Sequence, residues 1–379
     1  MVLCGSGVNI RFEEFIIVEL KSFLFMEDLL SLFHTSKQVF DFKKKHYYLE
    51  LHGTSSEKYC TDKKYRYKII DTLYDVSKQL SLTFYGDDDD DYEGGEMDLL
   101  IQMLEKNAHI LGSVHTLDLS GIEVDDDMLE YFGNITTLLL DNCVKTQCEG
   151  TKHLSGVHTL SLMNTQIEGV HFLGNVFNLN LSGCTDLKFD NTMDLQGIEI
   201  LNLSFTDITD NDVQFLGHIS ELDFSGCYNI TDISTTYLRK AHTLLLSDTK
   251  ITDEGVKNLA DLIYLDLSMC KEITDEGFKY LGNVKELLLD ATYITSKGLQ
   301  YLTTVNTLSL ASAWNMDDAC CAHLQNIYTL NISKNHNLTD ACLFNFNNVE
   351  HLTIYQCKLL TLNGILNIKC KNLNYCIYS

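Results

Sequence analysis

The chain has 379 residues, of which 45% are hydrophobic, and it carries a formal net charge of −25. This charge argues against binding to nucleic acid or to an anionic membrane surface, and no apolar run approaches the roughly 18 residues that a membrane span needs. The 13 cysteines, in a chain whose start lacks an export signal, favour reduced thiols in the cytoplasm or nucleus over a secreted disulfide scaffold.

The segment 11–42 predicts two or three short amphipathic helices. On pattern alone it is a helical cap, which a repeat array needs at its end. Its apolar residues fall at Ile16, Ile17, Leu20, Phe23, Leu24, Leu29, Leu30, Leu32 and Phe33.

This segment also resembles a degenerate F-box, the helical module that binds a Skp-type adaptor. Leu24-Phe-Met-Glu-Asp28-Leu29 fits the Leu-x-x-x-Asp-Leu element, and residues 35–39 fall at the spacing of the final element. Glu13 stands where the family has Pro, and Val39 stands where it has Trp. The resemblance implies adaptor contacts through Phe12, Ile16, Ile17, Leu20, Leu24, Asp28, Leu29 and Leu32.

Residues 44–113 predict irregular first repeats. Tyr48–Leu51 and Leu80–Phe84 alternate as two strands, and the stretch between them predicts a helix around 62–78. The run GDDDDDYEGGEMD at 86–98 is too acidic and too rich in glycine to pack, so it predicts a disordered loop.

From residue 114 to 379 a Leu-x-Leu core recurs at steps of mostly 21 or 22 residues. Each unit reads L-x-L-S-x-(C/T), then I-T-D-x-G, then apolar residues at three-residue steps. The pattern predicts a short strand, a turn and one or two helical turns that Asp253 and Asp275 cap. Neighbouring units must stack, because neither element can bury its apolar face alone. The cores begin at Leu117, Leu138, Leu160, Leu179, Leu201, Leu222, Leu244, Leu265, Leu287, Leu308, Leu330, Leu352 and Leu373.

The array resembles the cysteine-containing class of leucine-rich repeats. The resemblance implies an α/β solenoid, a parallel β horseshoe of 21–22-residue repeats, behind a small all-α segment. Three parts are expected: an F-box-like segment at 1–43, irregular first repeats at 44–113, and the repeat array at 114–379. This layout resembles that of F-box/leucine-rich-repeat proteins. The sequence of the repeats is most similar to that of members from large DNA viruses and protists.

The turn after each strand alternates between cysteine and threonine, as at Thr249 and Cys270. Their side chains are expected to bond to turn backbone that would otherwise stay unpaired. Successive cysteines lie two strands apart, roughly 10 Å, which is beyond the reach of a disulfide or a shared metal.

No phosphate-binding loop, metalloprotease motif or nucleophile elbow is present. Cys320, Cys321, Cys342 and His323 lack a recognised metal-ligand spacing. The sequence therefore predicts no enzyme, no cofactor and no metal.

Side-chain alternation along the strands predicts a concave surface that bears several acids and no Lys or Arg. It is either a solvated face, with the acid serving solubility, or a docking surface for a partner with basic and apolar features. For docking, the candidate target-binding residues are Asp118, Glu221, Asp223, Tyr264, Asp266, Glu286, Leu288 and His351.

Two functions follow from these patterns. In the first, which the F-box resemblance implies, the protein is a substrate receptor of a cullin-type ubiquitin ligase, with the adaptor on residues 12–40 and the target on the concave face. In the second, it is a binding or scaffold protein without a ligase, and the helical segment is only a cap.

Overall fold

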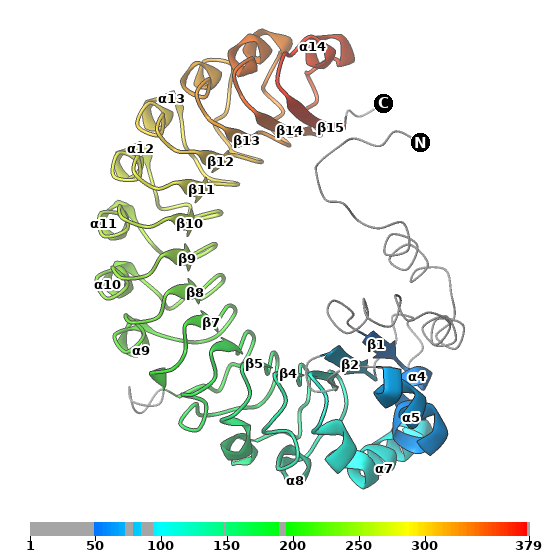
Figure 1. Ribbon diagram of the computed structural model, residues 1–379. Helices are drawn as coiled ribbons and strands as arrows, with labels where there is room; N and C mark the ends of the chain where they lie inside the picture. The colour runs from blue at the N-terminus through cyan, green and yellow to red at the C-terminus, as the bar shows by residue number, and fades with distance from the viewer. Residues whose placement is uncertain (1–48, 73–78, 85–93, 148, 189–194, 377–379) are drawn as a thin grey trace. The chain divides into compact units, whose positions relative to one another are not determined.

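The computed structural model describes residues 49–72, 79–84, 94–147, 149–188 and 195–376. Fifteen strands form one parallel sheet and follow each other in chain order, with helices between them (Figure 1). The predicted α/β solenoid is therefore confirmed. The strands are β1 (Leu49–His52), β2 (Leu80–Thr83), β3 (Thr116–Asp118), β4 (Thr137–Leu139), β5 (Thr159–Ser161), β6 (Asn178–Asn180), β7 (Ile200–Asn202), β8 (Glu221–Asp223), β9 (Thr243–Leu245), β10 (Tyr264–Asp266), β11 (Glu286–Leu288), β12 (Thr307–Ser309), β13 (Thr329–Asn331), β14 (His351–Tyr355) and β15 (Asn372–Cys376).

The chain divides into two compact units, residues 1–160 and 161–379. In the first unit, the two irregular strands are confirmed as β1 and β2. The helix predicted around 62–78 is confirmed over residues 63–72, while residues 73–78 lie outside the described part of the chain, and a further helix at 54–61 was not predicted. The helices of this unit are α4 (Thr54–Thr61), α5 (Lys63–Thr72), α7 (Gly94–Leu111), α8 (Asp126–Leu129) and the 3-10 helix η1 (Gly150–Leu154).

The helix α7 begins inside the segment for which the sequence predicts a disordered loop, so that prediction is wrong at its end. The acidic loop was expected to run from 86 to 98, but the helix begins at Gly94. Leu104, Ala108 and Leu111 are buried at helical spacing, and this apolar face supports a helix that extends back into the predicted loop. The acidic composition hid the start of the amphipathic pattern.

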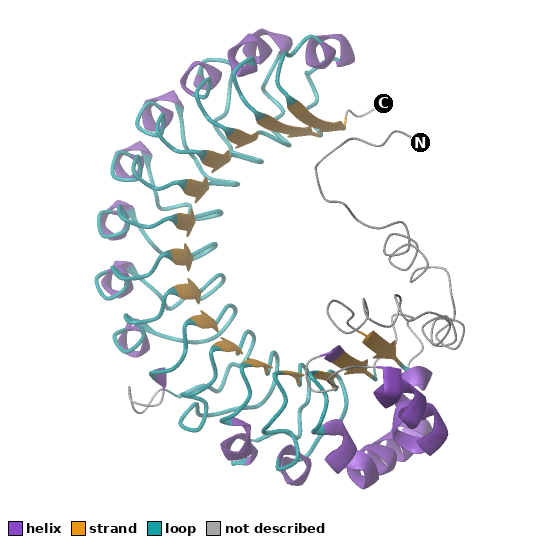
Figure 2. Cartoon of the chain, viewed as in Figure 1, coloured by secondary structure: helices purple, strands orange, loops and turns teal. Residues whose placement is uncertain are grey.

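In the second unit, each strand is followed by a loop and a short helix. Within this unit the strands line the inner side of the curve and the helices the outer side (Figure 2). The helices are α9 (Asp210–Val213), α10 (Asp232–Thr235), α11 (Asp253–Val256), α12 (Asp275–Phe278), α13 (Ser296–Leu299), α14 (Leu362–Leu366) and the 3-10 helices η3 (Cys320–His323) and η4 (Asp340–Phe346).

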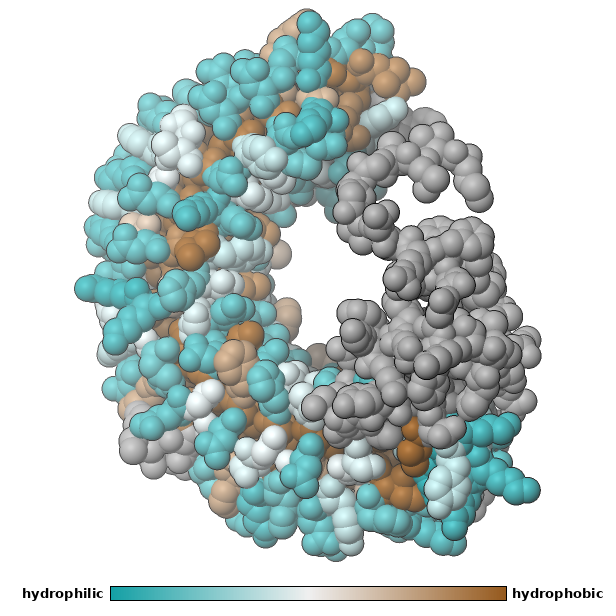
Figure 3. Space-filling view, viewed as in Figure 1, coloured by the Kyte–Doolittle hydropathy of each residue, from teal (hydrophilic) through white to brown (hydrophobic). Residues whose placement is uncertain are grey.

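The core of the second unit lies between strands and helices, where hydrophobic residues gather (Figure 3). Leu244 and Leu246 project into it from the strand side, and Val256 and Leu259 from the helix side, with at most 1% of each exposed. Each such side chain contributes about 1.5–3 kcal/mol when fully buried. Burial of the Leu-x-Leu pair in successive repeats therefore holds the stack together, as the sequence predicts.

The turn after each strand explains the alternation of threonine and cysteine. Thr249 donates its hydroxyl hydrogen to the Leu246 carbonyl of its own repeat, at 2.7 Å. Cys270, in the next repeat, donates its thiol hydrogen to the same carbonyl, at 3.1 Å. Threonine closes its own turn, and cysteine reaches back one repeat. Two other carbonyls accept the same pair of donors, Leu162 from Thr165 and Cys184, and Leu203 from Thr206 and Cys227.

Asn335 occupies this turn position in a later repeat and performs both tasks. Its side-chain amide donates to the Ile332 carbonyl of its own repeat at 2.9 Å and to the Leu310 carbonyl of the preceding repeat at 2.8 Å. The expected bonding to turn backbone is therefore confirmed for threonine, cysteine and asparagine. The position selects a buried donor rather than a thiol.

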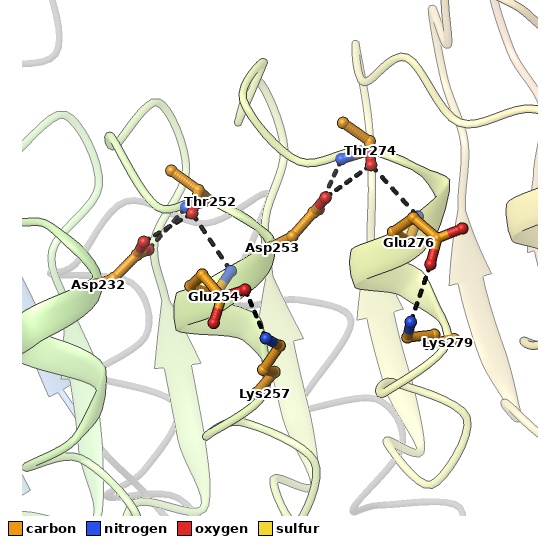
Figure 4. A network of polar contacts seen from close by, with 8 residues as sticks. All are labelled: Asp232, Thr252, Asp253, Glu254, Lys257, Thr274, Glu276 and Lys279. Carbon is orange, nitrogen blue, oxygen red and sulfur yellow. Dashed lines mark hydrogen bonds and ion pairs between the residues drawn. The ribbon is translucent and has the colours of Figure 1, made fainter.

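A second set of contacts joins the outer side of neighbouring repeats (Figure 4). Thr252 caps α11, because its hydroxyl oxygen accepts from the Glu254 amide at 3.2 Å. The Asp232 carboxylate of the preceding repeat accepts from the Thr252 amide at 2.8 Å and from its hydroxyl at 2.6 Å. The same links join Asp210 to Thr231, Asp253 to Thr274, Asp275 to Thr295, Asp318 to Thr339 and Asp340 to Thr361.

This geometry shows that the expected role of Asp253 and Asp275 as helix caps is wrong. Each of them lies in the first helical turn, one residue after the threonine that caps it. From there its carboxylate reaches the next repeat instead of its own helix. The ITD motif therefore combines a cap with a link between repeats.

The glycine of the same motif leaves room for that carboxylate. A Cβ atom at Gly277 would lie 2.4 Å from the Asp253 Oδ1 atom. In the repeat that has Ser234 at this position, the serine hydroxyl donates to Asp210 at 2.5 Å. The position thus accepts either no side chain or one that bonds to the aspartate.

Candidate protein-binding surface

The inner face of the second unit presents one side chain at each end of every short strand. Asp223 and Asp266 lie at the carboxyl ends of β8 and β10, where each accepts a hydrogen bond from the backbone amide two residues on, at 2.9 Å from Ser225 and 2.8 Å from Ser268. Asn202 makes the same turn with Ser204. These acids therefore hold the strand ends as asparagine does, and their charge is additional to that role.

The acids nevertheless form an electrostatic cluster over β8 to β11. Burial raises the pKa of the Asp266 carboxyl, and the carboxylates of Asp290 and Asp223 raise it further, against the opposing effect of hydrogen bonds from Ser268. Burial, together with the charges of Asp266 and Glu286, also raises the pKa of the Tyr264 hydroxyl. Burial is the largest cause of both shifts and the neighbouring carboxylates add to it, so a cation placed on this face would be attracted by those carboxylates.

A hollow crosses the inner face from β10 to β14. Asp266, Leu288 and Asp290 line it at one end and Tyr355 at the other. Asp290 is held in place because its carboxylate accepts from the Ser309 hydroxyl at 2.5 Å and from the Ala311 amide at 2.8 Å. The hollow therefore combines negative charge with aromatic and aliphatic surface.

The predicted target-binding residues divide into four groups. Tyr264 and Asp266 pair in register with Glu286 and Leu288 across β10 and β11, so these four lie together. On β8, one strand beyond β9, Glu221 is exposed and Asp223 is half-buried. His351 is the first residue of β14, and its ring packs edge-on against the Tyr328 ring, with the two ring centroids 5.4 Å apart. Asp118 ends β3 in the first unit.

Lys334 borders the same hollow and was missed by the sequence interpretation. It follows the strand positions used to define the concave face, and its backbone is left-handed, with φ 60°. Nine described non-glycine residues share that conformation in the equivalent turn position, including Asp248, Met269 and Gln356. The residue directly before each buried Thr, Cys or Asn takes this left-handed turn position, so the repeat pattern is the sequence signal that could have located Lys334.

The predicted adaptor-binding residues lie outside the described part of the chain. That set is Phe12, Ile16, Ile17, Leu20, Leu24, Asp28, Leu29 and Leu32. Within the described part, no helix is long and apolar enough to cross a membrane. No group of three or more His, Cys, Asp or Glu side chains gathers there in a way that would hold a metal ion.

Comparison with protein families identifies leucine-rich repeats. Residues 198–217, 242–260 and 261–282 match the family model described as Leucine Rich repeat. These stretches cover β7, β9 and β10 and the helix that follows each of them, and they leave out β8. A comparison with curated proteins finds no match.

Solved structures with a similar fold include an internalin, InlF, from Listeria monocytogenes, with a TM-score of 0.53 and 19% identity over 72% of this chain and 82% of that one. The TLR13–ssRNA13 complex gives a TM-score of 0.55 and 14% identity, over 90% of this chain and 51% of the TLR13 chain. The yeast Rad7–Elc1 complex gives a TM-score of only 0.41 at 16% identity, over 74% of this chain and 82% of that one. The first two show the leucine-rich-repeat fold alone, and the third is too distant to inform function.

Proposed function

We propose that the protein is a protein-interaction module whose inner face in the second unit binds a basic segment of a partner protein. The observation that carries this proposal is the acidic cluster of Asp223, Asp266, Glu286 and Asp290. Burial raises the pKa of the Asp266 carboxyl, and the charges of Asp290 and Asp223 raise it further. A lysine or arginine of the partner would offset this repulsion, and Tyr264 and Leu288 would supply contact area beside it.

The direct test is calorimetric titration of the full chain with a peptide of alternating Lys and Leu residues. A peptide of alternating Ser and Leu is the neutral control. The expected result is saturable binding of the Lys peptide that weakens as salt screens the charges, and at least tenfold weaker binding of the neutral peptide. Equal affinity for the two peptides would refute the electrostatic basis of the proposal.

We further propose that the module is the substrate receptor of a cullin-type ubiquitin ligase. Support comes from the resemblance of residues 12–40 to an F-box, where Leu24, Asp28 and Leu29 match the central element. In this role the protein supplies no nucleophile and acts by holding the target near a ubiquitin-loaded enzyme.

Two double variants of the full chain, each measured for adaptor binding and for peptide binding, test the receptor role. Leu24→Asp with Leu29→Asp should abolish co-purification with a Skp-type adaptor and cullin while leaving the Lys–Leu peptide affinity unchanged. Asp223→Asn with Asp266→Asn should do the reverse. If the wild-type chain retains neither adaptor nor cullin, the competing function holds, which is a scaffold whose helical segment is only a cap.

A further inference from the structure

A second surface runs along the loops that follow the strands of the second unit, and its chemistry differs from that of the inner face. The residue directly after the buried turn position is aromatic or basic in seven successive repeats, and all seven side chains are exposed. We call this row the rim. It consists of Tyr228, Lys250, Lys271, Tyr293, Trp314, His336 and Lys358.

The aromatic part of the rim is organised rather than incidental. The rings of Tyr293 and Trp314 stack with centroids 6.0 Å apart and planes inclined at 27°. The Trp314 indole donates its Nε1 hydrogen to the Ala291 carbonyl at 3.1 Å, which fixes the ring. Trp314 nevertheless remains 60% exposed. A fixed and exposed tryptophan is a typical energetic centre of a protein interface.

A hollow opens beside Trp314, on the side of the later repeats. Met316 forms part of its floor, and Lys334, His336 and Asn337 stand around it. None of the residues that line it is Asp or Glu, although acids outnumber Lys and Arg by 53 to 28 in the chain. The local charge is therefore opposite to that of the molecule.

Two lysines at this end of the row are available to a ligand, the rim residue Lys358 and Lys334, which lies two residues before the rim residue His336. Lys334 and Lys358 are exposed, and neither forms an ion pair with any residue that the structure describes. At the other end of the rim, Asp248 accepts from the Tyr228 hydroxyl at 2.9 Å and Glu272 follows Lys271 in the chain. Acids therefore stand beside the earlier part of the row, whereas the hollow beside Trp314 is lined by no Asp or Glu.

We propose that Trp314, Lys334, His336 and Lys358 form a second docking site, which binds a short acidic peptide segment of a protein. Carboxylates of the segment pair with the two lysines, and an apolar side chain enters the hollow against the indole. The short cationic stretch favours a peptide over a nucleic acid strand, which would continue past Glu272 and Asp248. This proposal does not rest on the inner-face function, although Lys334 borders both hollows.

The test uses Trp314 as its own reporter, because it is the only tryptophan in the chain. The full chain is titrated with the acetylated peptide Glu-Glu-Phe-Glu-Glu while tryptophan emission is followed. A Lys-Lys-Phe-Lys-Lys peptide and a ten-nucleotide oligothymidylate serve as alternative ligands. The expected result is a saturable emission shift with the acidic peptide only, weaker at high salt.

Two double variants of equal charge complete the test. Lys334→Gln with Lys358→Gln should weaken binding of the acidic peptide at least tenfold, whereas Lys257→Gln with Lys279→Gln, next to α11 and α12, should change it less than twofold. Circular dichroism confirms that both variants stay folded. The proposal is overturned if the acidic peptide gives no saturable shift, if both pairs weaken it equally, or if either alternative ligand binds as tightly.

Discussion

At the scale of single residues, the hydroxyl of Thr249 is central to the turn that ends each strand. Its Leu246 acceptor has a second donor, the Cys270 thiol, but a thiol is a weak donor. Thr249→Val should therefore lower the free energy of unfolding by about 1–2 kcal/mol, measured by urea denaturation. Thr249→Ser keeps the hydroxyl and should cost less. A larger loss in Thr249→Ser than in Thr249→Val would show that the methyl group, not the hydrogen bond, matters.

Asp266 offers a test of the inner-face electrostatics through pH. Its pKa is raised in the folded state, so below the ordinary carboxyl pKa of about 3.9 the carboxyl is protonated in both states and Asp266→Asn should change stability little. As the pH rises through the raised pKa, the folded wild type should lose stability relative to the variant. Thermal unfolding from pH 3 to 7 measures the difference, and a variant that becomes less stable than wild type as the pH rises would contradict the assigned repulsion.

At the scale of elements, the link between successive helices depends on a single carboxylate. Asp253 accepts two hydrogen bonds from Thr274, at 2.8 and 2.6 Å. Asp253→Ala should lower the free energy of unfolding by about 2–3 kcal/mol, because bonds to a charged group are lost and the Thr274 donors are left without it. Glu254→Ala, which removes only an exposed pair with Lys257, should cost less than about 1 kcal/mol. Similar losses in both would contradict the linking role.

The glycine beside that carboxylate gives a second test at this scale. Gly277→Ala adds a Cβ atom 2.4 Å from the Asp253 Oδ1 atom and should destabilise by about 1–3 kcal/mol, although alanine is the better helix former. Gly277→Ser should be tolerated better, because Ser234 already bonds to an aspartate from this position. If alanine proves more stable than both glycine and serine, the carboxylate does not restrict the position.

The strands could be predicted from the sequence, but some contacts between repeats could not. The repeat spacing predicted every strand core from Leu117 onward, because burial of the Leu-x-Leu pair imposes a fixed period. It did not predict the role of Asp253, since its contact lies 21 residues away in the next repeat and a cap looked equally suitable for a short polar side chain. The inner face could be predicted by alternation, but Lys334 could not, because it follows the strand in a left-handed turn.

At the scale of the whole molecule, the cysteines are expected to contribute as packed hydrogen-bond donors. The described part of the chain holds 11 free cysteines, of which only Cys370 and Cys376 are not buried. Burial raises the pKa of the Cys143 thiol to about 12, which keeps it protonated. The midpoint of thermal unfolding should therefore shift by less than about 2 °C between buffers with and without a reducing agent, whereas a large drop on reduction would reveal a stabilising disulfide.

Charge is distributed over the second unit with opposite signs on two surfaces. The inner face carries carboxylates that repel one another, while the surface around Trp314 carries Lys334 and Lys358, which form no ion pair with the residues that the structure describes. A net charge of −25 alone would attract any basic peptide to any face. The proposed function therefore requires that binding depend on where the acids lie and not only on how many there are.

The most direct measurement compares two double variants that each remove two negative charges. Asp223→Asn with Asp266→Asn keeps the backbone hydrogen bonds that Asn202 shows to be compatible with the repeat. Glu254→Gln with Glu276→Gln removes two exposed carboxylates from the outer helices. By calorimetric titration with the Lys–Leu peptide, the inner-face pair should weaken binding about tenfold and the outer pair less than twofold. Equal effects of the two pairs, or none from the first, would contradict the assignment of the inner face as the binding surface.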